Sequence, residues 1–128
     1  MLFPSNSYNR NIAILYFIMG VSKKEIFNDR VNRLATLTKA LGHPARIAII
    51  EVLIQENSCI CRDLVSEIGL SQPTISQHLK ELKDVGLIKG KVDGPKMCYC
   101  LDISTIHEIR DAFSKLTTSA LKSISDCC

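Results

Sequence analysis

The chain has 128 residues, a formal net charge of +3 and hydrophobic residues at 46% of its positions. These values exclude a multi-domain protein and indicate one domain with enough apolar side chains for a core, and at most an accessory arm. Because so small a domain leaves much of its surface exposed, oligomerisation would add stability. The mild positive charge permits contact with phosphates without requiring it.

Six cysteines in so short a chain would suit a disulfide framework in an oxidising compartment. No secretory pattern supports that setting: the apolar run 12–19 follows only Arg10 and lacks a small-residue cleavage site. The run is also far shorter than the roughly 20 residues of a membrane-spanning helix. We therefore expect a cytoplasmic protein whose paired thiols stay reduced and bind metal or sense redox state.

The first residues differ from the rest, and residues 1–21 are expected to form an N-terminal extension. Met19-Gly20-Val21-Ser22-Lys23-Lys24 would make an ordinary cytosolic amino terminus, so one hypothesis places the biological start at Met19. The alternative is an extra helix that packs on a dimer.

Helical periodicity begins near Lys23 and predicts a helix that ends at Gly42. Its apolar face carries Phe27, Val31, Leu34, Leu37 and Leu41. Pro44 suits the first turn of a second helix, which is apolar over a wide arc and is expected at the centre of the core. Cys59-Ile60-Cys61 is expected to be short and extended.

A short helix over 62–68, a turn at Gly69 and a second helix from Ser71 follow. Gly69 allows a left-handed turn. Ser71 is a good N-cap, and Gln72-Pro73 suits the first turn of the helix that follows. The inner face of the second helix carries Ile75, Leu79, Leu82 and Val85. A hairpin with its turn at Asp93-Gly94 comes next. A final helix has Ile103, Ile106, Ile109, Phe113, Leu116, Ala120 and Ile124 on one side. The fold class is mainly α with a small β-hairpin (α+β).

Two short helices around a glycine turn, followed by a basic hairpin, are typical of a DNA-binding helix-turn-helix with a wing. Gln, Ser and Thr at the start of the second helix can hydrogen-bond base edges, and lysines can contact phosphates. The alternative is an ordinary helical hairpin with a polar face. The candidate DNA-contacting residues are Ser71, Gln72, Pro73, Thr74, Ser76, Gln77, His78, Lys80, Lys83, Lys89, Lys91 and Lys96.

The segments LGHPAR (41–46), CICRDL (59–64), SQPTISQHLK (71–80) and GLI (86–88) resemble the ArsR/SmtB family of bacterial metalloregulatory repressors. The resemblance covers roughly residues 31–101, and SQPxxSxHLKxL is a specific signature of the family's recognition helix. It implies that residues 22–128 form a winged helix-turn-helix domain that dimerises through its first and last helices. It also implies that an inducer releases the homodimer from operator double-stranded DNA.

Cys59 and Cys61 are the candidate metal ligands, because alternate residues of a strand face the same side. Cys61 also lies at the predicted start of a helix, where the dipole lowers a thiol pKa. Thiolates bind soft ions, whereas the alternative is that both are small core residues.

The CxC before Asp63 resembles the arsenic-sensing branch, in which three thiolates hold As(III) or Sb(III). Leu64 and Val65 stand where one form of that pattern has a third Cys, so the third ligand comes from elsewhere or is absent. Taken singly, the pairs Cys98/Cys100 and Cys127/Cys128 are expected to be incidental. Zinc on the last helix is disfavoured, because Asp102, His107 and Asp111 lack a second His.

Three functions follow from these residues. The first is a repressor that leaves DNA when As(III), or a similar soft ion, bridges Cys59 and Cys61. The second keeps the DNA binding and makes the thiols a redox switch. The third is a small thiol-dependent reductase, which is disfavoured because no Cys has a positioned base partner. We therefore expect a regulator and not an enzyme.

Overall fold

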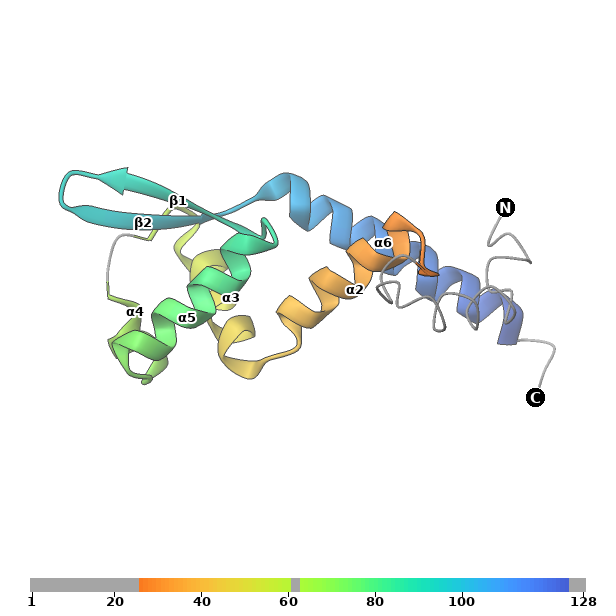
Figure 1. The fold of residues 1–128 in the computed structure, drawn as a ribbon, viewed down its shortest axis with the longest axis horizontal. Helices are drawn as coiled ribbons and strands as arrows, with labels where there is room; N and C mark the ends of the chain where they lie inside the picture. Colours follow the sequence, from red (N-terminus) through yellow and green to blue (C-terminus); the bar gives the residue numbers. More distant parts are fainter. Residues whose placement is uncertain (1–25, 61–62, 125–128) are drawn as a thin grey trace.

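The helices and strands follow the predicted order along the chain (Figure 1). The computed structural model describes residues 26–60 and 63–124; the predicted N-terminal extension, Met19 and Cys61 lie outside them. The elements are α2 (Asp29–Leu41), α3 (Pro44–Glu56), α4 (Leu64–Ile68), α5 (Gln72–Asp84), β1 (Ile88–Asp93), β2 (Lys96–Leu101) and α6 (Ile103–Ile124). This is a winged helix-turn-helix, with α4 and α5 as the two helices and β1–β2 as the wing.

The core lies where α3 and α5 meet the base of the wing. Ile49 of α3, Leu82 of α5, and Leu87 next to β1 are completely buried. Burying an aliphatic side chain of this size contributes roughly 1.5–3 kcal/mol, so these residues hold α5 against α3 at the centre of the domain. Helix α3 is thus the central element that the sequence predicted, although Ile47 and Ile54 remain on the surface.

Polar side chains fix the starts of α2, α3 and α4. Asn28 Oδ1 accepts from Val31 N at 3.0 Å, His43 Nδ1 from Ala45 N at 3.1 Å, and Asp63 Oδ1 from Val65 N at 2.9 Å. The cap at Asp63 makes α4 begin at Leu64, two residues later than predicted. Such caps satisfy backbone N–H groups that have no partner inside the helix.

The turns around α5 follow from glycine and serine, with one departure from expectation. Gly69 has φ of 78°, the left-handed conformation expected between α4 and α5. Ser71 occupies the N-cap position of α5, but its hydroxyl pairs with the Thr74 hydroxyl at 2.8 Å and makes no capping bond to the backbone.

The wing is a two-stranded antiparallel sheet in which Ile88 pairs with Leu101 and Asp93 pairs with Lys96. The turn is therefore Gly94-Pro95, one residue later than the predicted Asp93-Gly94. Gly94 supplies the positive φ of 57° that a two-residue hairpin turn needs at its first central position. A third extended piece joins the sheet at one position, where Ile60 forms an isolated bridge with Tyr99.

Helix α6 runs alongside α2 and away from the wing (Figure 1). Its apolar side is the one predicted, yet Thr105 alone among its 22 residues is buried. Ile103, Leu116, Leu121 and Ile124 are all exposed, and Leu121 retains 73% of its accessible surface. Among the described residues, no helix is long and apolar enough to cross a bilayer.

Candidate nucleic-acid interface and thiol site

The outer face of α5 is polar and small along its first two turns. Gln72, Thr74, Ser76 and Gln77 are exposed, while Ile75 beside them is buried. Gln72 Nε2 donates to Ser76 Oγ at 3.1 Å, and Gln77 donates to the Glu81 carboxylate at 3.2 Å. Exposed bonds of this kind exchange readily, so the same groups can turn to base edges in a major groove.

His78 differs from the other residues of the predicted DNA-contacting set in that it is buried. Its side chain is buried and its ring lies 4.4 Å from the ring of His43, which caps α3. Burial lowers the pKa of His78, and the nearby His43 and Arg46 lower it further. A neutral ring packed between α3 and α5 positions the reading helix, and it does not reach the exposed face.

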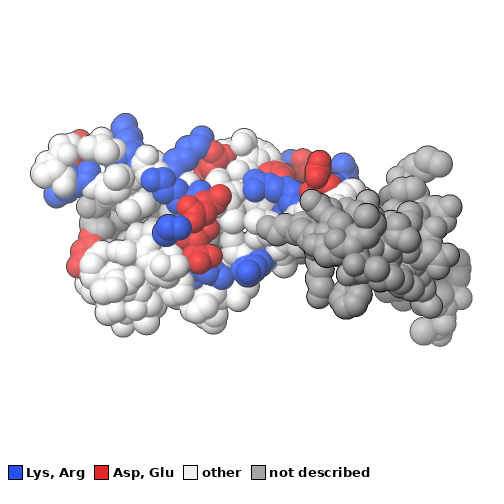
Figure 2. Space-filling view, viewed as in Figure 1, with Lys and Arg blue, Asp and Glu red and all other residues white. Residues whose placement is uncertain are grey.

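The predicted lysines divide into paired and unpaired groups. Lys80 contacts Asp84 at 2.8 Å and Lys89 contacts Asp102 at 2.6 Å. Lys83, Lys91 and Lys96 are exposed and have no acidic partner within the described residues. Figure 2 shows basic side chains over the wing and along the neighbouring face, with acidic side chains between them. The unpaired lysines are therefore the stronger candidates for phosphate contacts.

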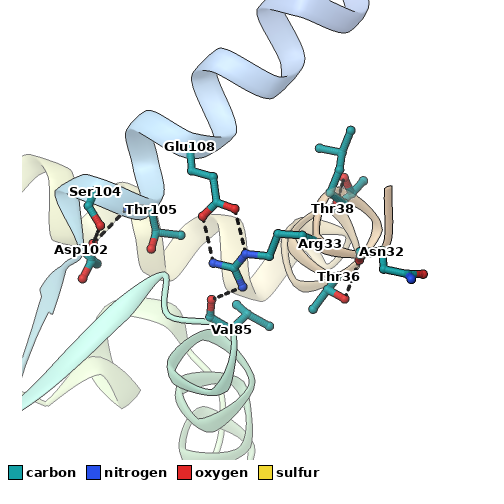
Figure 3. A network of polar contacts seen from close by, with 10 residues as sticks. Asn32, Arg33, Thr36, Thr38, Val85, Asp102, Ser104, Thr105 and Glu108 are labelled. Carbon is teal, nitrogen blue, oxygen red and sulfur yellow. Dashed lines mark hydrogen bonds and ion pairs between the residues drawn. The ribbon is translucent and has the colours of Figure 1, made fainter. Parts of the chain in front are cut away.

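Asp102 and Asp111, which the sequence offered as zinc ligands, are used in other ways. Asp102 caps α6, because its Oδ1 accepts from Thr105 N at 3.0 Å and from Ser104 Oγ at 2.9 Å (Figure 3). The hydrogen bond from Lys89 is the main cause that holds the pKa of Asp102 well below its usual range. Asp111 accepts from Arg110. No group of three His, Cys, Asp or Glu side chains suited to a metal occurs among the residues described.

Arg33 joins three helices at one point, and nothing in the sequence analysis singled it out (Figure 3). Its Nε and Nη2 donate to the two carboxylate oxygens of Glu108 on α6, at 2.9 and 3.0 Å. Its Nη1 donates to the carbonyl of Val85, the C-cap of α5, at 3.0 Å. The guanidinium thereby satisfies a carbonyl that has no partner inside α5. We call this contact of Arg33, Glu108 and Val85 the arginine junction.

Cys59 and Cys100 form a disulfide that joins the segment after α3 to strand β2. Ile60 and Tyr99 beside them exchange both backbone hydrogen bonds at 2.9 Å. The next pair along antiparallel strands is a non-hydrogen-bonded pair, in which Cα atoms come to about 4.5 Å. The Cα atoms of Cys59 and Cys100 lie 4.4 Å apart, as that geometry requires. We call this bond the cysteine junction.

The cysteines are thus arranged differently from the sequence expectation. Cys100, expected to be incidental, is the partner of Cys59, and the bond is a disulfide where reduced thiols were expected. Cys98 is buried and also disulfide-bonded. Cys61, Cys127 and Cys128 lie outside the described residues. The pairing could be found from sequence only by matching Cys59-Ile60-Cys61 with Cys98-Tyr99-Cys100 as antiparallel neighbours.

A cavity of about 330 Å³ opens beside the cysteine junction. Both cysteines line it, together with Leu53, Ile54, Leu101, Ile103, Asn57 and Ser58. Cys59 is exposed and Cys100 is half-buried, so small molecules can reach the sulfur atoms from this side.

Comparison with known proteins gives consistent matches to this fold. The family model described as bacterial regulatory protein, arsR family, matches residues 43–89. An uncharacterized HTH-type transcriptional regulator of Methanocaldococcus jannaschii is 33% identical over 63% of this chain and 91% of its own length. The arsenical resistance operon repressor of Staphylococcus xylosus is 34% identical over 67% of this chain and 82% of its own length.

A solved structure extends the match to three dimensions. The transcriptional repressor BigR from Xylella fastidiosa aligns with a TM-score of 0.53 and 26% identity. The alignment covers 73% of this chain and 89% of that one.

Proposed function

Because the chain belongs to the arsR family of bacterial regulatory proteins, which are DNA-binding transcriptional regulators and not enzymes, we propose that it is a cytoplasmic repressor that a thiophilic ion releases from operator DNA. Family membership excludes the reductase considered from the sequence. The observation that carries the proposal is the exposed polar face of α5 beside a wing with unpaired lysines. The ion is As(III) or Sb(III), held by cysteine thiolates that include Cys59.

Operator recognition divides between α5 and the wing. Gln72, Thr74, Ser76 and Gln77 enter the major groove and contact base edges, and Ser71 and Pro73 lie at the entry of the helix. Lys91 and Lys96 contact the backbone from the wing, with Lys83 and the ion-paired Lys80 and Lys89 at the edges. Lys80 and Asp84 are both exposed, and surface ion pairs contribute only about 0–1 kcal/mol, so a phosphate can replace Asp84 as the partner of Lys80.

The protein acts as a homodimer, as members of the family typically do. The exposed apolar residues of α6, Leu116, Leu121 and Ile124 among them, support this because they leave a hydrophobic strip next to α2. A second copy would cover that strip and place two α5 helices for two half-sites of one operator.

The inducer proposal rests on the chemistry of the thiols. Thiolates favour soft ions, and Cys59 is exposed at the cavity beside β2. A relative from Staphylococcus xylosus is named for an arsenical resistance operon. Cys61 remains a ligand predicted from sequence, and the ion would bind after reduction of the bond between Cys59 and Cys100.

The DNA-binding proposal is tested by measuring affinity for a selected operator against salt concentration. Gln77→Ala removes a base contact, so we expect a loss of about 1–3 kcal/mol and relaxed specificity. Lys91→Ala removes a phosphate contact and should reduce the salt slope by about one, without changing sequence preference. Lys115→Ala on α6 is the matched control and should change neither. Equal binding of Gln77→Ala and wild type to every sequence would contradict the proposal.

The inducer is tested by titrating arsenite into the reduced protein on operator DNA, while thiolate absorption reports binding. We expect release of the wild type and no release of Cys59→Ser. Full induction of Cys59→Ser would reject the assignment of Cys59.

A second candidate, a thiol-based redox regulator of the same fold, is favoured by the disulfide between Cys59 and Cys100. For this candidate an oxidant in metal-free buffer should release the operator, and arsenite should have no effect on the fully oxidised protein.

A further inference from the structure

A second cavity, of about 600 Å³, opens between α2 and the C-terminal half of α5. Its volume lies in the range of pockets that hold small molecules. Arg33, Thr36 and Ala40 line it from α2 at steps of three and four residues, so they share one face of that helix. Glu81 and Val85 line it from α5. The cavity therefore lies between the reading helix and a helix that holds it in place.

One part of the cavity is apolar. Ala35 and Ala40 leave space because their side chains are short, and Val85 adds a branched aliphatic group. Phe27, just before α2, contributes an aromatic ring that is 40% exposed. Removing apolar surface from water is favourable, so these residues suit the apolar body of a small molecule.

The charged groups around the cavity leave one positive charge without a partner. Arg33 pairs with both carboxylate oxygens of Glu108, and Glu81 Oε2 lies 3.8 Å from Arg46 Nη1. Lys39 also lines the cavity, is exposed, and has no acidic partner within residues 26–60 and 63–124. An anion would pair with Lys39, whereas a cation would be repelled by both Lys39 and Arg33. The cavity thus favours an anionic ligand.

The arginine junction forms part of the same cavity. Arg33 crosses from α2 to the end of α5, where its Nη1 donates to the Val85 carbonyl at 3.0 Å (Figure 3). A guanidinium binds a carboxylate more strongly than a neutral carbonyl, because the acceptor is charged and matches its planar fork. A carboxylate in the cavity would therefore compete with Val85 for Arg33. Losing that bond would leave a carbonyl at the end of α5 without its partner.

We propose that this cavity binds a small organic carboxylate with an apolar body, held by Lys39 and Arg33, and that the bound carboxylate weakens operator binding by drawing Arg33 away from Val85. The binding site does not depend on the proposed function, whereas its effect on DNA rests on it. No described cysteine lines the cavity, so the site is separate from the thiols.

The first test compares two probes with the same ring system, 2-naphthoate and 2-naphthamide, of which only the first carries a carboxylate at neutral pH. Each is titrated into the purified protein and followed by its fluorescence. We expect 2-naphthoate to bind with a dissociation constant in the millimolar range or below, as its size allows. The amide should bind about tenfold more weakly, because it lacks the charge. Absence of saturable 2-naphthoate binding, or equal affinity of the two probes, would overturn the proposal without requiring any variant to fold.

The second test locates the probe with two variants and a matched control. Lys39→Gln removes the positive charge, and Ala35→Leu fills the cavity from an exposed helical position at which leucine is well tolerated. Each should weaken 2-naphthoate binding about tenfold. Thr38→Leu adds similar bulk at an exposed position of α2 outside the cavity and should bind as wild type does. Wild-type affinity in either Lys39→Gln or Ala35→Leu would place the probe elsewhere and overturn the proposal.

The third test measures operator affinity, using DNA that the ligand-free protein selects from a random duplex library. Saturating 2-naphthoate should weaken wild-type binding about fivefold or more, in the range usual for coupled sites. Sodium acetate at the same concentration controls for ionic strength, and 2-naphthamide should have no effect. Lys39→Gln and Ala35→Leu should bind the operator as wild type does and should not respond. Unchanged or tighter operator binding by wild type with 2-naphthoate would overturn the proposed regulation.

This proposal and the proposed function fail separately. If the protein selects no operator, the proposed DNA-binding function is wrong, while the titration still reports whether the carboxylate binds. If the protein selects an operator and does not bind 2-naphthoate, only the carboxylate site is wrong.

Discussion

Helix α5 and the wing are each held to the rest of the domain by one named junction. The junction at α5 is made of hydrogen bonds, and the junction at the wing is covalent. At the arginine junction, Arg33 holds the C-terminal end of α5 to α2 and α6 through hydrogen bonds of 2.9–3.0 Å. At the cysteine junction, the disulfide between Cys59 and Cys100 holds the wing to the segment after α3. The polar contact can break and re-form within each binding event, whereas the disulfide changes only by chemistry. The first junction is thus suited to positioning the reading helix and the second to recording a signal.

Breaking the cysteine junction should have the largest effect on stability. A loop of this length, 41 residues of separation, is worth about 4 kcal/mol in the chain-entropy model, and measured values are often lower. We expect reduction of wild type to lower the free energy of unfolding by roughly 2–4 kcal/mol at fixed protein concentration. Denaturant titration with and without reductant measures this. Cys100→Ser should respond less to reductant than wild type, because only the bond at Cys98 is then left to reduce. Equal midpoints for wild type in both states would contradict the prediction.

Breaking the arginine junction should have a smaller effect. Hydrogen bonds to charged groups contribute about 1.5–3 kcal/mol, but the side chains of Arg33 and Glu108 are 40% and 41% exposed, so solvent reduces the effect to about 1 kcal/mol. We expect Arg33→Gln to lose that amount in denaturant titration and to weaken operator binding. Arg33→Lys keeps the charge without the planar fork and should recover only part of both.

The control for the arginine junction is Arg110→Gln, which removes an exposed contact with the adjacent Asp111. It should change stability by less than about 0.5 kcal/mol. If Arg33→Gln behaved like Arg110→Gln in both measurements, the junction would have no role in holding α5.

Acidification tests the packing of α5 against the start of α3, at His78 and His43. Its pKa is lowered in the folded state, so the unfolded chain takes up the proton first as the pH falls below about 6.5. Stability is therefore highest above that pH and decreases toward the lower folded pKa. The groups facing His78 are His43, Arg46 and Glu81. Thermal melts from about pH 7.5 to 5.5 should flatten in His78→Gln; an unchanged slope would assign the effect elsewhere.

The smallest effect is expected at the link between Lys89 and Asp102, because Lys89 is largely exposed. The lowered pKa of Asp102 stabilises the fold above the usual carboxyl pKa of about 3.9, and this is lost as the pH falls through the folded value. Asp102→Asn keeps an acceptor for the α6 cap and removes the charge. We expect its acid-unfolding midpoint to move to higher pH, and Asp84→Asn, the exposed control, to move less.

Much of the fold could be predicted because its signals are local. Helical periodicity, Pro44 after a capping residue and glycine at the α4–α5 turn each depend on a few neighbouring residues. The errors are local too: the Asp63 cap moved the start of α4, and the pairing of Asp93 with Lys96 moved the hairpin turn.

The site was harder to predict because its contacts join distant segments. The partner of Cys59 depends on the register between a short extended piece and β2, and alternation in so few residues specifies no partner. Arg33 is one of many polar residues on α2, and its contacts lie 52 and 75 residues away. Zinc was disfavoured at Asp102, but its role as a helix cap could not be predicted, because a carboxylate that caps a helix and one that binds an ion look alike in sequence.

The ring closed by Cys59 and Cys100 has a practical consequence for work with the purified protein. A protease that cuts at the exposed Gly94-Pro95 turn would leave the oxidised chain as two fragments joined through sulfur. Such a sample migrates as intact protein on a non-reducing gel and separates only after reductant is added. Integrity and redox state therefore have to be assessed on paired gels, since a single gel would confuse one with the other.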